Sequence, residues 1–341
     1  MRKSFSRMTL SLTYLTLALS AVAQSPGKNK LTDSNAKIAQ GKQGALWLDP
    51  ADIQSRNLFY GSGGKEHQPS GASFTFVDED LNGTNPKYNV RDEDGVKWKI
   101  KLGAEARPET AASRLIWAVG YFTNEDYFLP DLRVSELPSR LHRGRKLIGP
   151  NGEMRNARLK RHLKGEEKLG NWRWRDDPFA RTREWNGLRV MMALINNWDL
   201  KDNNNAIYDK SPERIYAVSD LGASFGTTGY NPRQETSKGN LEAYSHSQFI
   251  AKTTTTYVDF NVPSRPAIFV FFNPAEFFPR MNMRWIGKRV PRSDARWMGL
   301  LLARLSPPQI RDAFRAAGYS PEETEGFAKV VERRIAELVA L

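Results

Sequence analysis

The segment that most constrains the fold is residues 177–222, where a helical pattern runs into a loop rich in Asn and Asp and then into two strand patterns. The loop reads NWDLKDNNN, and the turn KSPE separates the strand patterns NAIYD and RIYAVSD. Apolar side chains recur upstream at helical spacing, namely Trp185, Leu188, Met191, Met192 and Ile195. This order predicts a helix that ends near Asn197, a polar loop, and a hairpin that ends at Asp220.

A second block, residues 73–122, is predicted to form a small sheet followed by a helix. The strand-like runs SFTFVDED, YNVRD and VKWKIKL are separated by the turn sequences NGTNPK and EDG. In the last run, apolar and Lys side chains alternate, so that Lys97, Lys99 and Lys101 share one face. Pro108 and Glu109 suit the first turn of a helix. We predict a three-stranded antiparallel meander with one covered face, then a helix.

The N-terminus has the pattern of a secretory signal peptide. A basic start precedes a mostly apolar stretch at residues 8–20, and small residues precede a cleavage point after Ala23. The apolar stretch is too short to span a membrane well. We predict a signal peptide over 1–23 and a secreted or periplasmic mature chain without a transmembrane span. Removing Arg2, Lys3 and Arg7 would lower the formal charge from +13 to +10.

The rest of the chain divides into four further segments. Residues 24–45 are polar and predict a disordered linker. We assign residues 46–135 to a first lobe of sheet and helix, 136–176 to a basic insert, and 177–341 to a second lobe that ends in helices. The chain is 40% hydrophobic and has nine Trp, which is enough apolar material for two lobes. It has no Cys, which excludes disulfides and thiolate metal sites.

The basic insert has two open interpretations. Lys and Arg are concentrated within residues 139–175. The stretch is either a solvated polar face or a patch that binds an anionic surface, such as a polymer or lipid headgroups. The sequence carries no specific signal for nucleic acid.

The Asn-rich loop and the hairpin carry a set of residues suited to phosphoryl transfer. Asp199 is followed five residues later by Asn204, and Asp220 begins the sequence DLG at the end of the hairpin. Such chemistry needs a carboxylate to orient the attacking hydroxyl, oxygen ligands for Mg²⁺, and a cation on the phosphates. Lys101, which closes WKIK on a predicted strand, can supply that cation.

These motifs resemble those of the protein-kinase-like superfamily. DLKDNN is similar to the Asp-Leu-Lys-x-x-Asn catalytic loop, DLG to the Asp-Phe-Gly metal motif, and WKIK to the strand that carries the lysine. The resemblance covers about residues 73–226 and is nearest the atypical members, namely HipA-type, phosphoinositide-kinase-type and secretory-pathway kinases. It implies a two-lobed α+β fold, with a small antiparallel-sheet N-lobe and a mainly helical C-lobe. It also implies ATP and Mg²⁺, or Mn²⁺, as cofactors.

The resemblance assigns roles in the second lobe. Asp199 would be the catalytic base and Lys201 would contact the transferred phosphate. Asp220 and one of the adjacent asparagines would hold the metal. Asn204 fits the motif spacing, and its neighbours Asn203 and Asn205 remain alternatives.

It also assigns roles in the first lobe. Lys101 would bind phosphate and would be steadied by Glu109, with Glu105 as the alternative partner. No Gly-x-Gly-x-x-Gly loop is present, so the turn NGTNPK, with Gly83 and Lys87, would cover the phosphates.

The sequence thus favours an exported kinase-like phosphotransferase, or a nucleotidyl transferase, with an unknown acceptor. No Ala-Pro-Glu segment follows Asp220, so a peptide-substrate platform of the usual kind is not expected. Two alternatives are a non-catalytic pseudokinase and an envelope-binding protein that uses the basic insert.

Overall fold

The computed structural model describes residues 44–83, 85–210, 213–228, 237–263, 271, 278 and 283–341. The predicted signal peptide over 1–23 and most of the predicted linker lie outside the described residues. The last two residues of that linker, Gly44–Ala45, form strand β1, which pairs in parallel with β9 (Glu213–Val218). The predicted linker boundary at residue 45 was therefore wrong, because these two residues already belong to a sheet.

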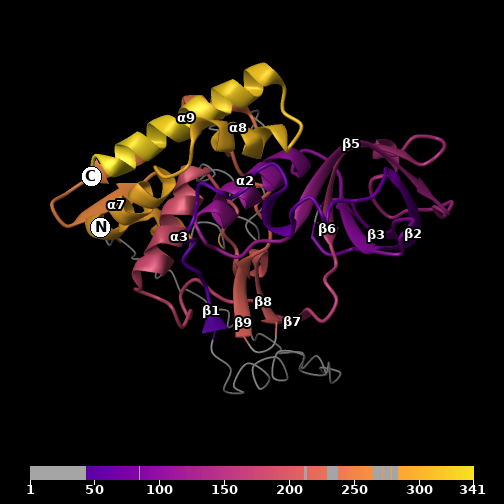
Figure 1. Ribbon diagram of the computed structural model, residues 1–341, viewed down its shortest axis with the longest axis horizontal. Helices are drawn as coiled ribbons and strands as arrows, with labels where there is room; N and C mark the ends of the chain where they lie inside the picture. Colours follow the sequence, from indigo (N-terminus) through magenta and orange to yellow (C-terminus); the bar gives the residue numbers. More distant parts are fainter. Residues whose placement is uncertain are drawn as a thin grey trace, which may run out of the picture. The chain divides into compact units, whose positions relative to one another are not determined.

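The N-terminal part is built on a closed five-stranded barrel in the order β2-β3-β4-β6-β5. Four of these strands, β2, β3, β5 and β6, are labelled in Figure 1. The predicted meander supplies β2 (Ser73–Glu79), β3 (Lys87–Arg91) and β4 (Lys97–Lys101). β5 (Asp126–Ser135) closes the barrel by pairing in parallel with β2, and β6 (Glu153–Arg161) pairs with both β4 and β5. The alternating apolar residues of these strands fill the interior, as their period of two predicts. The interior is formed by Phe74, Tyr88, Val90, Trp98, Ile100, Leu102, Tyr127, Leu132, Val134, Ile148, Met154, Ala157 and Leu159.

The predicted basic insert over 136–176 is not a separate segment. β6 lies in its middle and is a barrel strand, and β7 (Glu167–Gly170) pairs with β8 (Asn205–Lys210) of the second sheet. The insert prediction failed because charged side chains on the outer face of a strand look like a solvated loop when the pairing partners are distant in sequence.

The second sheet holds the predicted hairpin. Strands β8 and β9 pair antiparallel from Asn205↔Val218 to Lys210↔Glu213, and the four-stranded order is β1-β9-β8-β7. The two turn residues, 211 and 212, lie outside the described residues. A third sheet has the order β10-β11-β12, with β10 at Ile250–Thr253, β11 at Tyr257–Phe260 and β12 at Val290–Pro291.

Helices dominate the C-terminal part. They are α3 (Arg183–Leu194), α4 (Leu241–Ser245), α7 (Arg292–Leu302), α8 (Pro307–Arg315) and α9 (Pro321–Val339). Short 3₁₀ turns occur at Gly61–Gly63 (η1), Arg145–Leu147 (η2), Asp202–Asn204 (η3) and Arg284–Gly287 (η4). Helix α2 (Ala106–Ala118) packs against β5, β6 and α8, and so connects the barrel to the helices (Figure 1).

The chain therefore has the predicted α+β class, with a sheet-rich N-terminal part and a mainly helical C-terminal part. Among the described residues, no helix combines the length and apolar character that crossing a membrane would require.

Candidate active site

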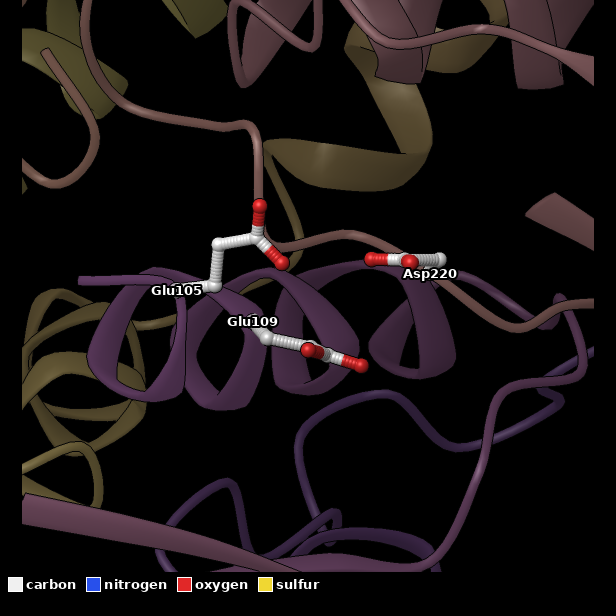
Figure 2. A group of neighbouring side chains, drawn as sticks. All are labelled: Glu105, Glu109 and Asp220. Carbon is white, nitrogen blue, oxygen red and sulfur yellow. The ribbon is translucent and has the colours of Figure 1, made fainter. Parts of the chain in front are cut away.

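The centre of the candidate site is the buried ammonium group of Lys101 at the end of β4. Its Nζ lies 2.6 Å from Glu105 Oε2, 2.7 Å from Glu109 Oε2 and 3.0 Å from Asp220 Oδ1. Glu105 immediately precedes α2 and Glu109 lies in its first turn, four residues later, so their side chains point to the same side of the helix. Figure 2 shows these two carboxylates on α2, with Asp220 on the neighbouring loop. Both glutamates therefore form an ion pair with Lys101.

A second layer of charges holds this centre in place. Arg158 on β6 is the cross-strand partner of Lys101, and its Nη2 lies 2.5 Å from Glu109 Oε1. Its Nη1 lies 3.5 Å from Asp126 Oδ1. Lys238 forms an ion pair with Glu105. All but Lys238 are almost completely buried, so these ion pairs are only weakly screened by water.

The electrostatics of the centre keep Lys101 charged. Burial alone would lower the pKa of Lys101, but Glu109, Asp220 and Glu105 raise it above its usual range. Burial would raise the pKa of Asp220, but the nearby Lys101 ammonium lowers it below its ordinary value. For Glu109, burial raises the pKa, while Arg158 and Lys101 act against that rise. The site therefore holds a permanent cation beside an ionised, accessible Asp220.

The Asn-rich loop begins where α3 ends. Asn196 adopts a left-handed backbone conformation with φ of 52°, which ends the helix, and Asn tolerates this conformation better than most residues. Asn197 Oδ1 then accepts a hydrogen bond from Asp199 N at 3.0 Å. In the loop, Lys201 Nζ lies 3.3 Å from Asp199 Oδ1, and the Asp199 side chain is 18% exposed. The first two asparagines of the loop thus shape the backbone that presents Asp199.

The loop is joined directly to the segment that carries Asp220. The carbonyl oxygen of Asn204 accepts hydrogen bonds from Ser219 N at 2.9 Å and Asp220 N at 3.1 Å. The side chain of Asn204 donates from Nδ2 to Asp199 O at 2.5 Å. Among the three adjacent asparagines, Asn204 is thus the one bonded to both Asp199 and Asp220.

Its neighbours face elsewhere. Asn203 is exposed, and its Oδ1 lies 3.4 Å from Asn171 Nδ2. Asn205 is buried and donates to Trp172 O at 3.3 Å. The position that the motif spacing selects is therefore also the one that the hydrogen bonds favour.

The turn between β2 and β3 lies close to Lys101. Lys87 is the cross-strand partner of Lys101. Burial and the Lys101 ammonium lower the pKa of Lys87, and Asp220 acts against that decrease. Gly83 has φ of +71°, and a side chain at this position would begin 3.4 Å from Lys87 Nζ. The structure thus brings Gly83 and Lys87 to the same end of the barrel as Lys101.

The residues present fit a divalent cation beside Asp220. Glu105, Glu109 and Asp220 each place an oxygen within 4.8 Å of the others, but the Lys101 ammonium already contacts all three. The Asp220 carboxylate remains 33% exposed. The amide nitrogen of Asn204 is committed to Asp199, so Oδ1 is the side-chain atom of Asn204 with the chemistry of a metal ligand. A carboxylate and an amide oxygen form a donor set that suits Mg²⁺ or Mn²⁺.

Three residues of the site were missed by sequence reasoning, namely Asp126, Arg158 and Lys238. No motif marks them. Arg158 could have been found only by recognising that RNARLKR is a strand paired with WKIK.

The chain is similar at low sequence identity to several solved structures. No protein-family model matches the chain, and no curated protein matches its sequence. The crystal structure of the Helicobacter pylori proinflammatory kinase CtkA is 10% identical, covers 79% of this chain and 95% of that chain, and has a TM-score of 0.44. The Golgi casein kinase is 9% identical over 94% of each chain, with a TM-score of 0.32. The kinase domain of maize SIRK1 is 12% identical over 79% of this chain and 94% of that chain, with a TM-score of 0.20. At these levels of similarity, the side-chain geometry carries the functional proposal.

Proposed function

We propose that this protein is a kinase-like phosphotransferase that uses ATP and Mg²⁺ or Mn²⁺. The observation that carries the proposal is the meeting of four separate sequence segments around Lys101. The strand lysine contacts the helix residue Glu109 and the loop residue Asp220, and Asn204 links Asp220 to Asp199.

Each group has a defined task in this proposal. Lys101, fixed by its carboxylates, offers its ammonium to the phosphates. Asp220 and Asn204 hold the metal ion, which when bound neutralises phosphate charge. Asp199 orients the attacking hydroxyl and accepts its proton, and the neighbouring Lys201 stabilises the transferred phosphoryl group.

Export is part of the proposal. It is supported by the basic start, the apolar stretch and the small residues that end at Ala23. N-terminal sequencing of the protein recovered from the periplasm or the medium would test it, because the mature chain should begin at Gln24. An intact N-terminus on the recovered protein would contradict cleavage.

Two alternatives make different predictions. A non-catalytic pseudokinase would bind Mg-ATP without turning it over. An envelope-binding protein that uses residues 139–175 would bind anionic surfaces with a steep dependence on salt and would not respond to ATP.

Formation of ADP by the purified protein tests the proposal. Replacing Asp199 with Asn should lower turnover by about 100-fold or more while Mg-ATP affinity stays within about threefold, since a proton acceptor acts mainly in the transition state. Asp202→Asn is the matched control, because Asp202 lies in the same loop and its Oδ1 accepts a bond from Trp174 N. Equal turnover in Asp199→Asn and wild type would refute this role for Asp199.

A further inference from the structure

The barrel face that carries Lys101 continues as a row of cations away from the phosphate end of the site. Lys87 is the cross-strand partner of Lys101, and Lys160 on β6 is the partner of Lys99. Directly opposed residues in antiparallel strands, and residues two apart on one strand, share a face of the sheet. These four lysines therefore lie on one surface.

Strand β7 extends this surface beyond the barrel. Lys160 Nζ bonds to Tyr208 OH at 2.8 Å and lies 5.0 Å from the ring centroid. Lys168 is the cross-strand partner of Tyr208. We call Lys87, Lys99, Lys160 and Lys168 the lysine row.

Three of the four lysines in the row form no direct ion pair with a carboxylate of the described residues. Lys99 pairs with Asp80 at 2.7 Å. Within the part of the chain that the structure describes, no carboxylate lies within ion-pair distance of Lys87, Lys160 or Lys168.

Burial also acts on the lysine row. Lys87 and Lys160 are half-buried, and burial lowers the pKa of each. Lys168 is exposed, and its pKa is lowered by partial loss of hydration next to its neighbours and by repulsion from the other three lysines of the row. Carboxylates farther away act on Lys87 and Lys160, but partly desolvated cations without a direct ion pair still cost free energy, and a bound anionic ligand would recover that cost.

The spread of the row constrains the ligand. From Lys87 to Lys160 the sheet spans two strand spacings and two residues along a strand, which is roughly 12 Å between Cα atoms. A nucleoside triphosphate gathers its charge at one end and presents an uncharged base and sugar at the other. It would neutralise the Lys87 end and leave Lys160 and Lys168 without an anion.

We propose that this site binds a small molecule with several phosphate groups spread over its framework, which regulates the proposed phosphotransfer by competing with Mg-ATP for the Lys101 end. One phosphate would lie at Lys101 and Lys87, and others at Lys160 and Lys168. This inference deepens the proposed function and rests on it for the Lys101 end.

Calorimetric titration of the full chain with two probes tests the inference. Myo-inositol hexakisphosphate carries distributed phosphates, and inorganic tripolyphosphate carries clustered ones. The hexakisphosphate should bind the wild type about tenfold more tightly than tripolyphosphate, because each additional charged hydrogen bond contributes about that factor. The variant Lys160→Met/Lys168→Met should lose about tenfold or more for the hexakisphosphate and less than about threefold for tripolyphosphate.

A charge-matched control separates this site from general attraction. Lys65 and Lys146 are exposed and lie outside the row, so Lys65→Met/Lys146→Met should change hexakisphosphate affinity by less than about twofold. If the double variant at the row does not fold, Lys168→Met alone serves, because Lys168 is exposed on its strand.

The possible outcomes are distinct. Equal losses in the row variant and the control, or no preference for the hexakisphosphate over tripolyphosphate, would overturn the inference. If hexakisphosphate binds as expected while Mg-ATP does not bind, the result supports ligand binding at the lysine row and refutes the ATP-dependent function. Competition between Mg-ATP and the hexakisphosphate would support a shared Lys101 end, and independent binding of the two would overturn that part of the inference.

Discussion

At the scale of single residues, the site depends on cations and carboxylates that are buried together. Lys101 contacts three carboxylates, and Glu109 is shared between Lys101 and Arg158. Removing one partner from such a network leaves an unpaired buried charge, which costs more than the pair itself contributes. The network therefore fixes Lys101 in one position before any ligand arrives.

Replacing Arg158 with Met tests this network. The change removes the buried cation that pairs with Asp126 and one of the two that pair with Glu109. We expect a loss of about 3–5 kcal/mol in the free energy of unfolding, measured by urea denaturation. Arg155→Met is the matched control on the same strand, since Arg155 is 84% exposed and its contact to Asp131 is 3.5 Å long. Similar unfolding midpoints for the two variants would show that Arg158 has no structural role.

The buried carboxyl group of Asp177 should make the stability of the fold depend on pH. Burial raises the pKa of Asp177 from 3.8 to about 6, and its Oδ1 accepts a bond from Phe179 N at 2.7 Å. Between about pH 4 and pH 6 the folded chain keeps a proton that the unfolded chain has released, so this group makes stability fall as pH rises through that window. Above it, the cost of the buried carboxylate is fully present.

Asp177→Asn should remove that cost while keeping the acceptor for Phe179 N. We expect a gain of up to about 3 kcal/mol at pH 7 that shrinks toward pH 4, measured as the free energy of unfolding at several pH values. Asp176→Asn, at a side chain that is 72% exposed, should leave the pH profile unchanged. If Asp177→Asn and wild type differ in stability by the same amount at pH 4 and pH 7, the assignment to Asp177 is wrong.

Motif spacing could predict only part of the site. Lys101, Asp199, Asn204 and Asp220 were identified because they are the residues that a phosphate and a metal need in a fixed order. The structure brings Lys101, Asp220 and Asn204 together, while their roles remain predictions. Arg158 could not be predicted, because its place beside Glu109 depends on the pairing of strands about 60 residues apart in sequence.

At the scale of secondary structure elements, the end of α3 determines where the Asn-rich loop starts. Arg334 on α9 is completely buried and donates to Leu194 O at 2.7 Å and to Asn196 Oδ1 at 2.9 Å. The last carbonyl groups of a helix lack hydrogen-bond donors within the helix, and at the end of α3 the Arg334 guanidinium is that donor. The last helix of the chain thus holds the residue from which the Asp199 loop departs.

Replacing Arg334 with Met should therefore weaken both the fold and the site. We expect a loss of about 3–5 kcal/mol in the free energy of unfolding, because several buried carbonyls lose their donor. Hydrogen exchange should also increase in the backbone of residues 194–204. Arg333→Met is the control, at a side chain that is 54% exposed. Unchanged exchange in the loop of Arg334→Met would show that α9 does not hold it.

Local sequence signals indicate individual helices and hairpins well, but they do not indicate which strands distant in sequence will pair. Capping boxes are such local signals, and they begin α8 at Ser306 and α9 at Ser320, where the serine side chain accepts a bond from the backbone three residues later. The turn sequence KSPE marked the hairpin β8-β9. Closure of the barrel by β5 and β6 was missed, since no local pattern states which strands will pair.

At the scale of the whole molecule, the two parts of the described chain share strands as well as the site. β1 from the predicted linker and β7 from the predicted insert both join the sheet that carries the hairpin. Lys101 and Asp220, which are 119 residues apart, meet at 3.0 Å between the barrel and the loop after that sheet. The central claim is that the site formed by Lys101 and Asp220 binds a nucleoside triphosphate together with its metal ion.

Calorimetric titration of ATP, with and without Mg²⁺, tests that claim most directly when wild type is compared with Asp220→Asn. The control is Asp94→Asn, which removes a carboxylate from an exposed position in the β3-β4 turn. We expect wild type and control to bind ATP in a Mg²⁺-dependent manner, and Asp220→Asn to lose that dependence with about tenfold or more weaker binding. Absence of ATP binding to the wild type at saturating Mg²⁺, or equal Mg²⁺-dependent affinity in Asp220→Asn, would contradict the account.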